Sequence, residues 1–252
     1  MSTQTVPKLE DLSREALELL VELKYAIREQ DEEDAIARLL ETSVMLEGKK
    51  RKGKSLSAVM ISYKLRERFG RHVITVGTKL GLTEQFGPHA EMTELQFKDA
   101  LGKIQDVVEE QQSQAAEDVW KALKEKGVDI MYSTIVFDEA GKLFEARNAM
   151  SKMVKLFSYF MDQQAHYHCT TIMCAPNRKR VDERIRQQVD WYGRVFHNKW
   201  THQCVVRLVS GLETLPLTFN GLDDTEHPAY YDMYHSWTLT GYTRSSLNIE
   251  HT

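Results

Sequence analysis

Short apolar runs alternate with amphipathic stretches along most of the chain, from about residue 44 to residue 219. Runs rich in β-branched residues predict buried strands, and apolar residues spaced three and four apart predict helices. This alternation predicts an α/β fold, a mostly parallel sheet flanked by helices. The predicted strands are Val44–Leu46, His72–Val76, Met131–Phe137, His168–Cys174, Gly193–Phe196, Cys204–Leu208 and Leu215–Phe219.

Three helical stretches separate these strands. The first carries Leu56, Val59, Met60 and Tyr63 on one face and has Gly70 as a suitable C-terminal stop. The second, Thr93–Lys126, has a polar midsection that is either a break or a solvated face, and the third is Phe144–Gln164. We expect a loop over Gly77–Pro88.

The two ends of the chain differ from this middle part. Residues 1–41 predict a helical N-terminal extension, whose second helix carries Ile36, Leu39 and Leu40 on one side. That apolar side must pack on the chain's own core or on a neighbouring subunit. We expect a P-loop ATPase core over 42–210, and a last strand with a polar tail rich in aromatic residues over 211–252.

Composition narrows the class of protein. The 252 residues carry a net charge of -4, so contact with a polyanion must be local. The three cysteines show no paired spacing, which favours a reducing compartment. The N-terminus has no signal-peptide pattern, and no run reaches the roughly 18 apolar residues needed to cross a bilayer. We therefore expect a soluble, intracellular protein.

A phosphate-binding motif lies between the first strand and the first helix. The chain reads Gly, four residues, Gly-Lys-Ser, which is typical of the P-loop of nucleotide-binding proteins. Backbone N–H groups, a lysine and a helix N-terminus together bind a triphosphate there, so ATP is the expected ligand. The predicted ATP-binding residues are Gly48, Lys49, Lys50, Arg51, Lys52, Gly53, Lys54, Ser55 and Leu56.

Two carboxylates follow the strand that ends at Phe137. Acidic residues at the carboxyl end of a parallel strand lie where such sheets bind ligands, and Asp138-Glu139 reads as a Walker B element. We expect Asp138, with Ser55, to hold Mg²⁺. Glu139 is the expected catalytic base that activates the attacking water.

Three segments together resemble the FtsK/HerA superfamily of P-loop motors: Gly53–Val59, Val136–Ala140 and Val181–Arg186. The most similar branches are the small genome-packaging ATPases of viruses with an internal membrane and the zonula-occludens-toxin-like assembly proteins of filamentous phages. The resemblance implies a homo-oligomeric ring, commonly a hexamer, that hydrolyses ATP to drive DNA through or past a central pore.

This chain departs from the superfamily pattern at two places. Relatives usually carry a glutamine as γ-phosphate sensor after the strand that follows Walker B. Here Asn177 is the only amide nearby, so it is the expected ATP-binding residue at this place. The filamentous-phage proteins also carry a membrane span after the motor domain, which this sequence lacks. The second departure favours the packaging branch: a motor for double-stranded DNA in the host cytoplasm or on the virion, with a capsid or membrane-vertex partner.

Other functions remain open at this stage. The chain could be a filamentous-phage assembly and export ATPase, or a P-loop kinase with Arg178–Arg186 as a phosphate-clamping lid. A nucleotide-gated scaffold is disfavoured because both Walker B carboxylates are present. The Arg178–Arg186 segment is either a solvated face or a contact for phosphate or DNA.

Ring ATPases also complete each site with an arginine from the next subunit. The candidates are Arg184, Arg186 and Arg147. The first two lie in a charged helix that we expect to open at Arg178, and Arg147 lies at the start of the helix after Walker B. Each could instead be an ordinary solvated charge.

Overall fold

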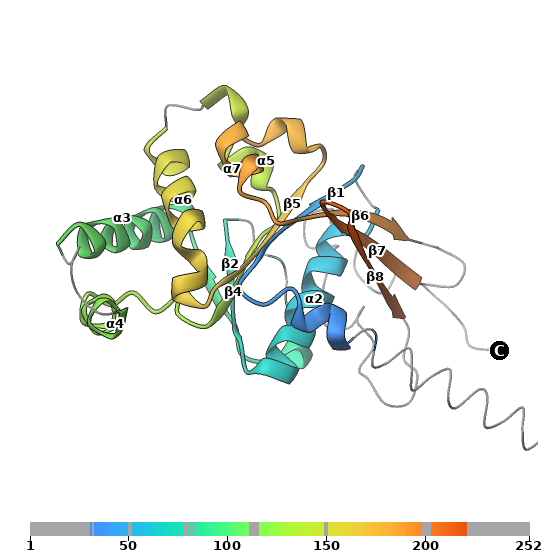
Figure 1. Cartoon of the computed structure of the whole chain (residues 1–252), viewed down its shortest axis with the longest axis horizontal. Helices are drawn as coiled ribbons and strands as arrows, with labels where there is room; N and C mark the ends of the chain where they lie inside the picture. Colours follow the sequence, from blue (N-terminus) through green and yellow to red (C-terminus); the bar gives the residue numbers. More distant parts are fainter. Residues whose placement is uncertain are drawn as a thin grey trace, which may run out of the picture.

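The computed structural model describes residues 31, 33–49, 52–77, 80, 82, 84–110, 116–148, 151–197 and 203–220. They form one eight-stranded sheet with the order β3-β2-β4-β5-β1-β6-β7-β8 (Figure 1). The strands from β3 to β6 are parallel, and β7 and β8 continue the sheet antiparallel to β6. The strands are β1 Ser43–Glu47, β2 His72–Val76, β3 Ala90–Met92, β4 Ser133–Phe137, β5 Thr170–Ala175, β6 Trp191–His197, β7 Gln203–Ser210 and β8 Glu213–Asn220.

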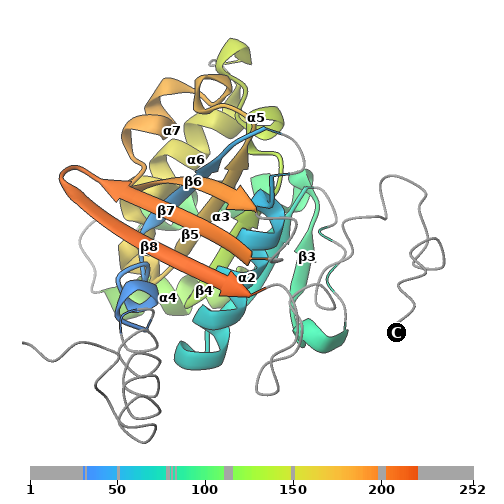
Figure 2. The same ribbon diagram turned by 90° about the vertical axis from the view of Figure 1, so that its right-hand side faces the viewer.

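Helices cover both faces of the parallel part of the sheet. Helix α2 packs on one face, and α3 and α6 pack on the other (Figures 1 and 2). Within the described residues, no helix combines the length and apolar character needed to cross a bilayer. The α-helices are α2 Lys54–Phe69, α3 Glu94–Glu110, α4 Ala116–Glu125, α5 Ala140–Leu143, α6 Lys152–Gln163 and α7 Glu183–Gln187; the 3₁₀ turns are η2 Glu84–Phe86, η3 Ala146–Asn148, η4 Gln164–Tyr167 and η5 Arg178–Arg180.

Alternate residues of the strands lie in two separate hydrophobic cores, one on each face of the sheet. In β1, Val44 and Leu46 lie in the core on the α2 side, whereas Met45 lies in the core on the α3 and α6 side. In strands β6 to β8 the buried core residues all lie on the α2 side of the sheet, among them Val206, Leu217 and Phe219. The parallel strands are therefore buried on both faces, and the antiparallel extension mainly on one.

All seven predicted strands are present, with ends that differ by a few residues. The predicted stop of the first helix is confirmed, because Gly70 adopts φ 63° and its N–H bonds back to Arg66 O. The sequence missed β3, which has three residues, two of them exposed, and so shows no apolar pattern. It pairs with β2 through the backbone, from Ile74 opposite Ala90 to Val76 opposite Met92.

Three helix predictions need correction. The stretch Thr93–Lys126 contains two helices, α3 and α4, with 111–115 between them outside the described residues. Helix α6 begins at Lys152 rather than Phe144, because the side chain of Ser151 accepts a hydrogen bond from Val154 N at 3.2 Å and caps it. The charged segment from Arg178 is not one helix but the short turns η5 and α7.

The described part of the N-terminal segment packs on this chain. Ile36 and Leu39 are fully buried in the core on the α2 side, so these two residues need no neighbouring subunit to cover them. Arg38 adds an ion pair with Glu213 of β8 and lies 5.7 Å from the ring centre of Trp191. The predicted first helix and the aromatic tail lie outside the described residues.

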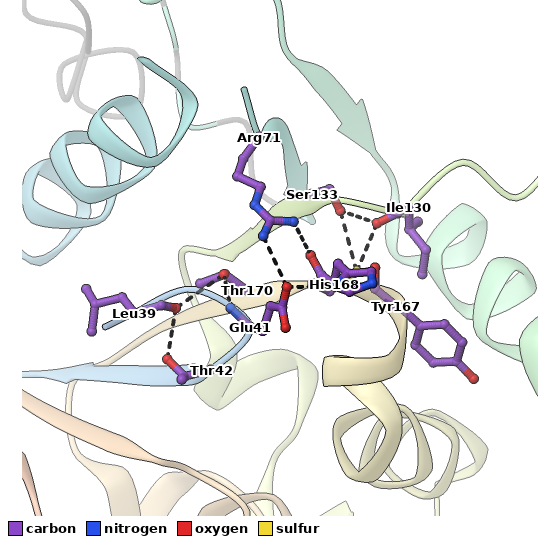
Figure 3. A network of polar contacts seen from close by, with 10 residues as sticks. Leu39, Glu41, Thr42, Arg71, Ile130, Ser133, Tyr167, His168 and Thr170 are labelled. Carbon is purple, nitrogen blue, oxygen red and sulfur yellow. Dashed lines mark hydrogen bonds and ion pairs between the residues drawn. The ribbon is translucent and has the colours of Figure 1, made fainter. Parts of the chain in front are cut away.

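A polar network joins the segments that enter the parallel strands at their amino ends (Figure 3). Arg71, before β2, is 7% exposed and donates to His168 O at 2.7 Å and to Glu41 Oε1 at 3.3 Å. The Nδ1 atom of His168, before β5, lies 2.6 Å from the same Glu41 oxygen. One arginine and one carboxylate therefore connect the starts of β1, β2 and β5.

The backbone is strained at the same place. Glu41, Tyr132 and His168 all adopt positive φ, between 52° and 60°, and they are the non-glycine residues in the described chain that do so. The rings of Tyr132 and His168 stack with centroids 4.7 Å apart, and the Arg71 guanidinium lies 5.6 Å from the Tyr132 ring centre. Side-chain contacts thus hold three unfavourable backbone conformations in place.

We expect Glu41→Gln to lower the free energy of unfolding by about 1–2 kcal/mol near neutral pH, since it weakens charged hydrogen bonds to Arg71 and His168. The estimate is modest because 35% of the Glu41 side chain is exposed. Chemical denaturation measures the difference, and Asp129→Asn, an exposed carboxylate without these contacts, is the control. Equal stabilities of wild type and Glu41→Gln would contradict a stabilising role for this network.

The same pair of proteins should differ in pH dependence. Burial acts to raise the pKa of Glu41, but the hydrogen bonds and charges of His168 and Arg71 outweigh it and hold the pKa below the usual value of 4.5. A carboxylate with a lowered folded-state pKa stabilises the fold above its unfolded pKa, and this contribution is lost as pH falls through the folded-state value. The advantage of wild type over Glu41→Gln should therefore shrink as pH drops below about 4.5.

Candidate active site

The predicted phosphate-binding loop connects β1 to α2 at the carboxyl end of the sheet. Gly53 ends the loop with φ 87°, a conformation that a side chain would strain, and directly precedes the helix. Lys50 and Arg51 lie outside the described residues, and Lys52 is exposed. The loop therefore has the strand, turn and helix arrangement that a P-loop requires.

The N-terminus of α2 is suited to anions. The helix has 16 residues, its first turn holds no acidic residue, and no side chain of the described chain caps it. Its first N–H groups and its dipole therefore favour a negatively charged ligand at this end. The Nζ atom of Lys54 donates to Lys49 O at 3.1 Å, so its positive charge lies within the loop.

The start of α2, next to the loop, is in direct contact with Asp138, the first of the two predicted Walker B carboxylates. The Ser55 hydroxyl, at the start of α2, donates a hydrogen bond to Asp138 Oδ1, at the end of β4. Strand β5 lies between β1 and β4 in the sheet, so this bond spans the end of a complete intervening strand. Residues 83 positions apart in the chain thus form one oxygen-rich site.

The pKa of Asp138 is shifted by its surroundings in this site. Burial raises its pKa above the usual 3.8; the hydrogen bond from Ser55 opposes the rise, and the neighbouring charge of Glu139 adds to it. Cys174, on β5, is buried beneath the same site: burial raises the pKa of its thiol well above 9.0, and the nearby charge of Asp138 raises it further. Negative charge is therefore disfavoured here unless a cation compensates it.

Glu139 is turned toward its own helix. It forms an ion pair with Lys142, three residues later, and both side chains are partly exposed at 41% and 74% respectively. The hydrogen bond and charge of Glu139 raise the pKa of Lys142. The second carboxylate thus lies beside the Ser55–Asp138 contact and is held by a lysine that solvent can reach.

Aromatic packing fixes the strand that presents these carboxylates. Phe137 directly precedes Asp138. The centroid of its ring lies 5.2 Å from that of Phe97, 5.2 Å from that of Phe144 and 5.1 Å from that of Phe157. Phe144 and Phe157 stack at 4.1 Å. These rings come from α3, the segment after α5, and α6, so the helical layer holds the end of β4 in position.

The residues present fit Mg²⁺ and a nucleotide triphosphate. A serine hydroxyl and a carboxylate in contact are oxygen donors of the kind that Mg²⁺ prefers. Burial and the charge of Glu139 raise the pKa of Asp138. The charges of Lys54 and Lys142 lower it but are outweighed, so the site can accept further positive charge. Lys54 and the α2 N-terminus lie beside the serine and this carboxylate for the phosphates. When bound, Mg²⁺ would supply positive charge at the phosphate oxygens.

Asn177 and two candidate arginines are engaged elsewhere. Asn177 is exposed, and its side-chain oxygen accepts from Lys179 N at 2.9 Å, so it caps η5. Arg184 forms an ion pair with Asp182 at 3.0 Å, and Arg186 Nε donates to Val181 O at 3.0 Å. Arg147 lies in the exposed turn η3, not at the start of a helix as expected. None of these residues touches the Ser55–Asp138 contact.

The sequence missed two residues that shape the site, Cys174 and Lys142. Cys174 lies beneath it because β5 separates β1 from β4, a strand order that no local pattern encodes. Lys142 pairs with Glu139 at a spacing of three residues, so a lysine three positions after a catalytic carboxylate could have indicated this contact.

The site can be compared with solved structures. The N-terminal domain of zonular occludens toxin from Neisseria meningitidis is similar, with 14% identity, a TM-score of 0.47, and coverage of 77% of this chain and 98% of that one. The DNA-packaging ATPase B204 from Sulfolobus turreted icosahedral virus has 13% identity and a TM-score of 0.46, covering 70% and 96%. The pCW3 conjugation coupling protein TcpA has 15% identity and a TM-score of 0.47, covering 75% and 63%.

No curated protein sequence matches the chain. A family match is clear, however: residues 43–201, more than half of the 252 residues, match the family described as Zonular occludens toxin (Zot). The match begins at the first residue of β1 and includes the phosphate-binding loop and both Walker B carboxylates. The chain therefore belongs to the zonular occludens toxin family and has the fold of a P-loop NTPase.

Proposed function

We propose that this chain is an ATP-hydrolysing motor that moves DNA and works as a homo-oligomeric ring. The hydrogen bond from Ser55 to Asp138 carries the proposal, because it joins the phosphate-binding loop to the carboxylate expected to hold Mg²⁺. Glu139 follows immediately as a second carboxylate. This combination serves hydrolysis of a triphosphate rather than binding alone.

Each of these residues has a separate task in the proposed reaction. Lys54 neutralises charge on the β- and γ-phosphates, and Ser55 and Asp138 hold the metal ion. Glu139 orients the attacking water and accepts its proton, which requires it to leave Lys142. The N-terminus of α2 contributes fixed backbone donors at the phosphates.

A small-molecule kinase receives less support. A lid over the acceptor must move, whereas the segment after β5 is held by its own chain: Asp182 N donates to Phe144 O at 2.9 Å, and Val181 bridges to Glu145. Arg184 and Arg186 are occupied within the same segment. These contacts favour a fixed element over a phosphate-clamping lid.

The use of the motor follows from the family. The sequence favours packaging of a viral genome, whereas membership of the zonular occludens toxin family favours the related assembly and export of a phage genome. Both uses need ATP-driven movement of DNA, with a capsid or membrane-vertex protein as partner. Of the two, we favour assembly and export.

Phosphate release is the direct test. We expect wild type to hydrolyse ATP, and to do so faster with DNA. The rate of Lys54→Ala should be at least about 100-fold lower, because the phosphate charge is no longer neutralised. Lys124→Ala, an exposed lysine on α4, is the matched control. Hydrolysis by Lys54→Ala at the wild-type rate would refute the site, and a rate unaffected by single- or double-stranded DNA would refute the motor.

The two carboxylates should fail in different ways. Glu139→Gln should bind ATP with wild-type affinity but hydrolyse it slowly, since an amide cannot accept a proton. Asp138→Asn should instead raise the Mg²⁺ concentration needed for binding. Fluorescent-nucleotide titrations across Mg²⁺ concentrations separate these effects, with Glu145→Gln as an exposed control. The same mild loss from both substitutions would argue against separate roles.

An arginine from the next subunit should complete the site, and Arg147 is now the leading candidate. It is exposed and makes no side-chain bond to another described residue, whereas Arg184 and Arg186 do. Mixing inactive Lys54→Ala with inactive Arg147→Ala should restore activity at about a quarter of the interfaces, where an intact loop meets an intact arginine.

The control for this mixture is Lys54→Ala with Glu139→Gln. Both residues act within one subunit, so no site regains both and activity should stay absent. Mass spectrometry shows whether the rings are mixed. If mixed rings of Lys54→Ala and Arg147→Ala stay inactive, Arg147 is not the arginine supplied in trans.

A further inference from the structure

The outward face of β6 and β7 carries several exposed side chains, among them Arg194, Phe196 and Arg207. Tyr192, Arg194 and Phe196 alternate along β6 on the side opposite Val195, which lies in the α2 core. On this side α3 and α6 cover the parallel strands, whereas β6 to β8 lie beyond these helices (Figure 1). Among the described residues of this face, Tyr192 is held by a neighbouring segment, since its hydroxyl donates to Arg186 O of α7.

Two arginines on this face oppose each other directly. Arg194 of β6 is the register partner of Arg207 of β7, and both are exposed. Among the described residues neither forms an ion pair with a carboxylate, although Glu47 of β1 is the register partner of Arg194 on its other side. Like charges at directly opposed positions are unfavourable, because their Cβ atoms lie only about 4.5–5.5 Å apart. An anion bound between the two guanidinium groups would relieve that repulsion.

A hollow of about 330 Å³ is lined by both arginines and by a third, Arg178. Its lining includes Arg178, Tyr192, Arg194 and Arg207, with Glu47 as its single carboxylate. Arg178 lies 5.4 Å from the Tyr192 ring centre and 3.9 Å from the Glu47 carboxylate. Three guanidinium groups against one carboxylate give the hollow a local excess of positive charge, although the chain as a whole is acidic.

An exposed aromatic ring continues the same face. Phe196 is two positions beyond Arg194 on β6, about 7 Å along the strand, and 57% of it is exposed. Arginines that bind phosphates beside an aromatic ring on a sheet face are the combination that single-stranded nucleic acids use, since an unpaired base can stack on the ring. A duplex offers the phosphates but keeps its bases stacked on one another.

We propose that this outward face of β6 and β7 binds single-stranded nucleic acid, with phosphates at Arg178, Arg194 and Arg207 and a base on Phe196. The proposal rests on the proposed function and deepens it, because it assigns the strand contact of the motor. Of the Arg178–Arg186 segment expected to contact DNA, the proposal keeps Arg178, since Arg184 and Arg186 are bound within their own segment. It also places the contact beside Glu47, the residue before the phosphate-binding loop.

The test is a titration of the full-length protein with fluorescent thirty-nucleotide oligo(dT) and with a duplex of the same length, across KCl concentrations. Arg194→Gln/Arg207→Gln should bind oligo(dT) at least about tenfold more weakly and lower the slope of log affinity against log salt by about 1.4, or roughly 0.7 for each lost phosphate. The control Lys152→Gln/Lys155→Gln removes the same charge from exposed positions on α6.

Phe196→Ala separates stacking from charge. It should weaken oligo(dT) binding by about 5-fold or more with an unchanged salt slope, and leave duplex affinity unaltered. Circular dichroism and light scattering establish that each variant keeps its fold and its assembly state.

Each outcome decides the proposal. Wild-type affinity for oligo(dT) in the arginine variant overturns it and leaves the DNA motor intact, whereas no binding of either oligonucleotide by wild type overturns the motor as well. An arginine variant that loses its assembly state identifies the face as an interface between copies. Equal losses for oligo(dT) and duplex in Phe196→Ala refute the single-strand preference.

Discussion

The contact between Ser55 and Asp138 depends on the order of three parallel strands. Strand β5 lies between β1 and β4, so the phosphate-binding loop and the Walker B carboxylates emerge at one edge, separated by one strand width. A serine at the first turn of α2 reaches across that width to the end of β4. The position of every other group in the site, from Lys54 to Glu139, follows from this arrangement, and the phenylalanines around Phe137 keep β4 in place.

The two edges of the parallel sheet carry different kinds of polar group. At the carboxyl edge, burial raises the pKa of Asp138 despite the nearby charges of Lys54 and Lys142, which suits a ligand that brings a further cation. At the amino edge, Arg71, Glu41 and His168 satisfy one another, and their contacts maintain three positive φ angles. At the carboxyl edge a bound ligand would neutralise the charge of the carboxylate. At the amino edge the charged groups neutralise one another and thereby fix the starts of the strands.

Local pattern was sufficient for the seven predicted strands, because each is a continuous segment with its own apolar pattern. The phosphate-binding loop and the Walker B pair stay predictions, with which the contact between Ser55 and Asp138 agrees. Local pattern was insufficient for β3, whose exposed Ala90 and Glu91 carry no apolar alternation and which is defined by pairing with β2. The start of α6 depended on one capping hydroxyl, that of Ser151. The sequence could not predict that Arg194 lies opposite Arg207, because this depends on the register between β6 and β7.

The end of the sheet at β8 has a consequence for how this protein meets others. Strand β8 is the outermost strand of the described sheet, and Pro216 sits in its middle, opposite Arg207 of β7. Proline has no N–H, so this free edge lacks one of the donors that an incoming strand would need. Continuous β-sheet growth from one molecule to the next, the route to fibrous aggregation, is therefore discouraged along β8.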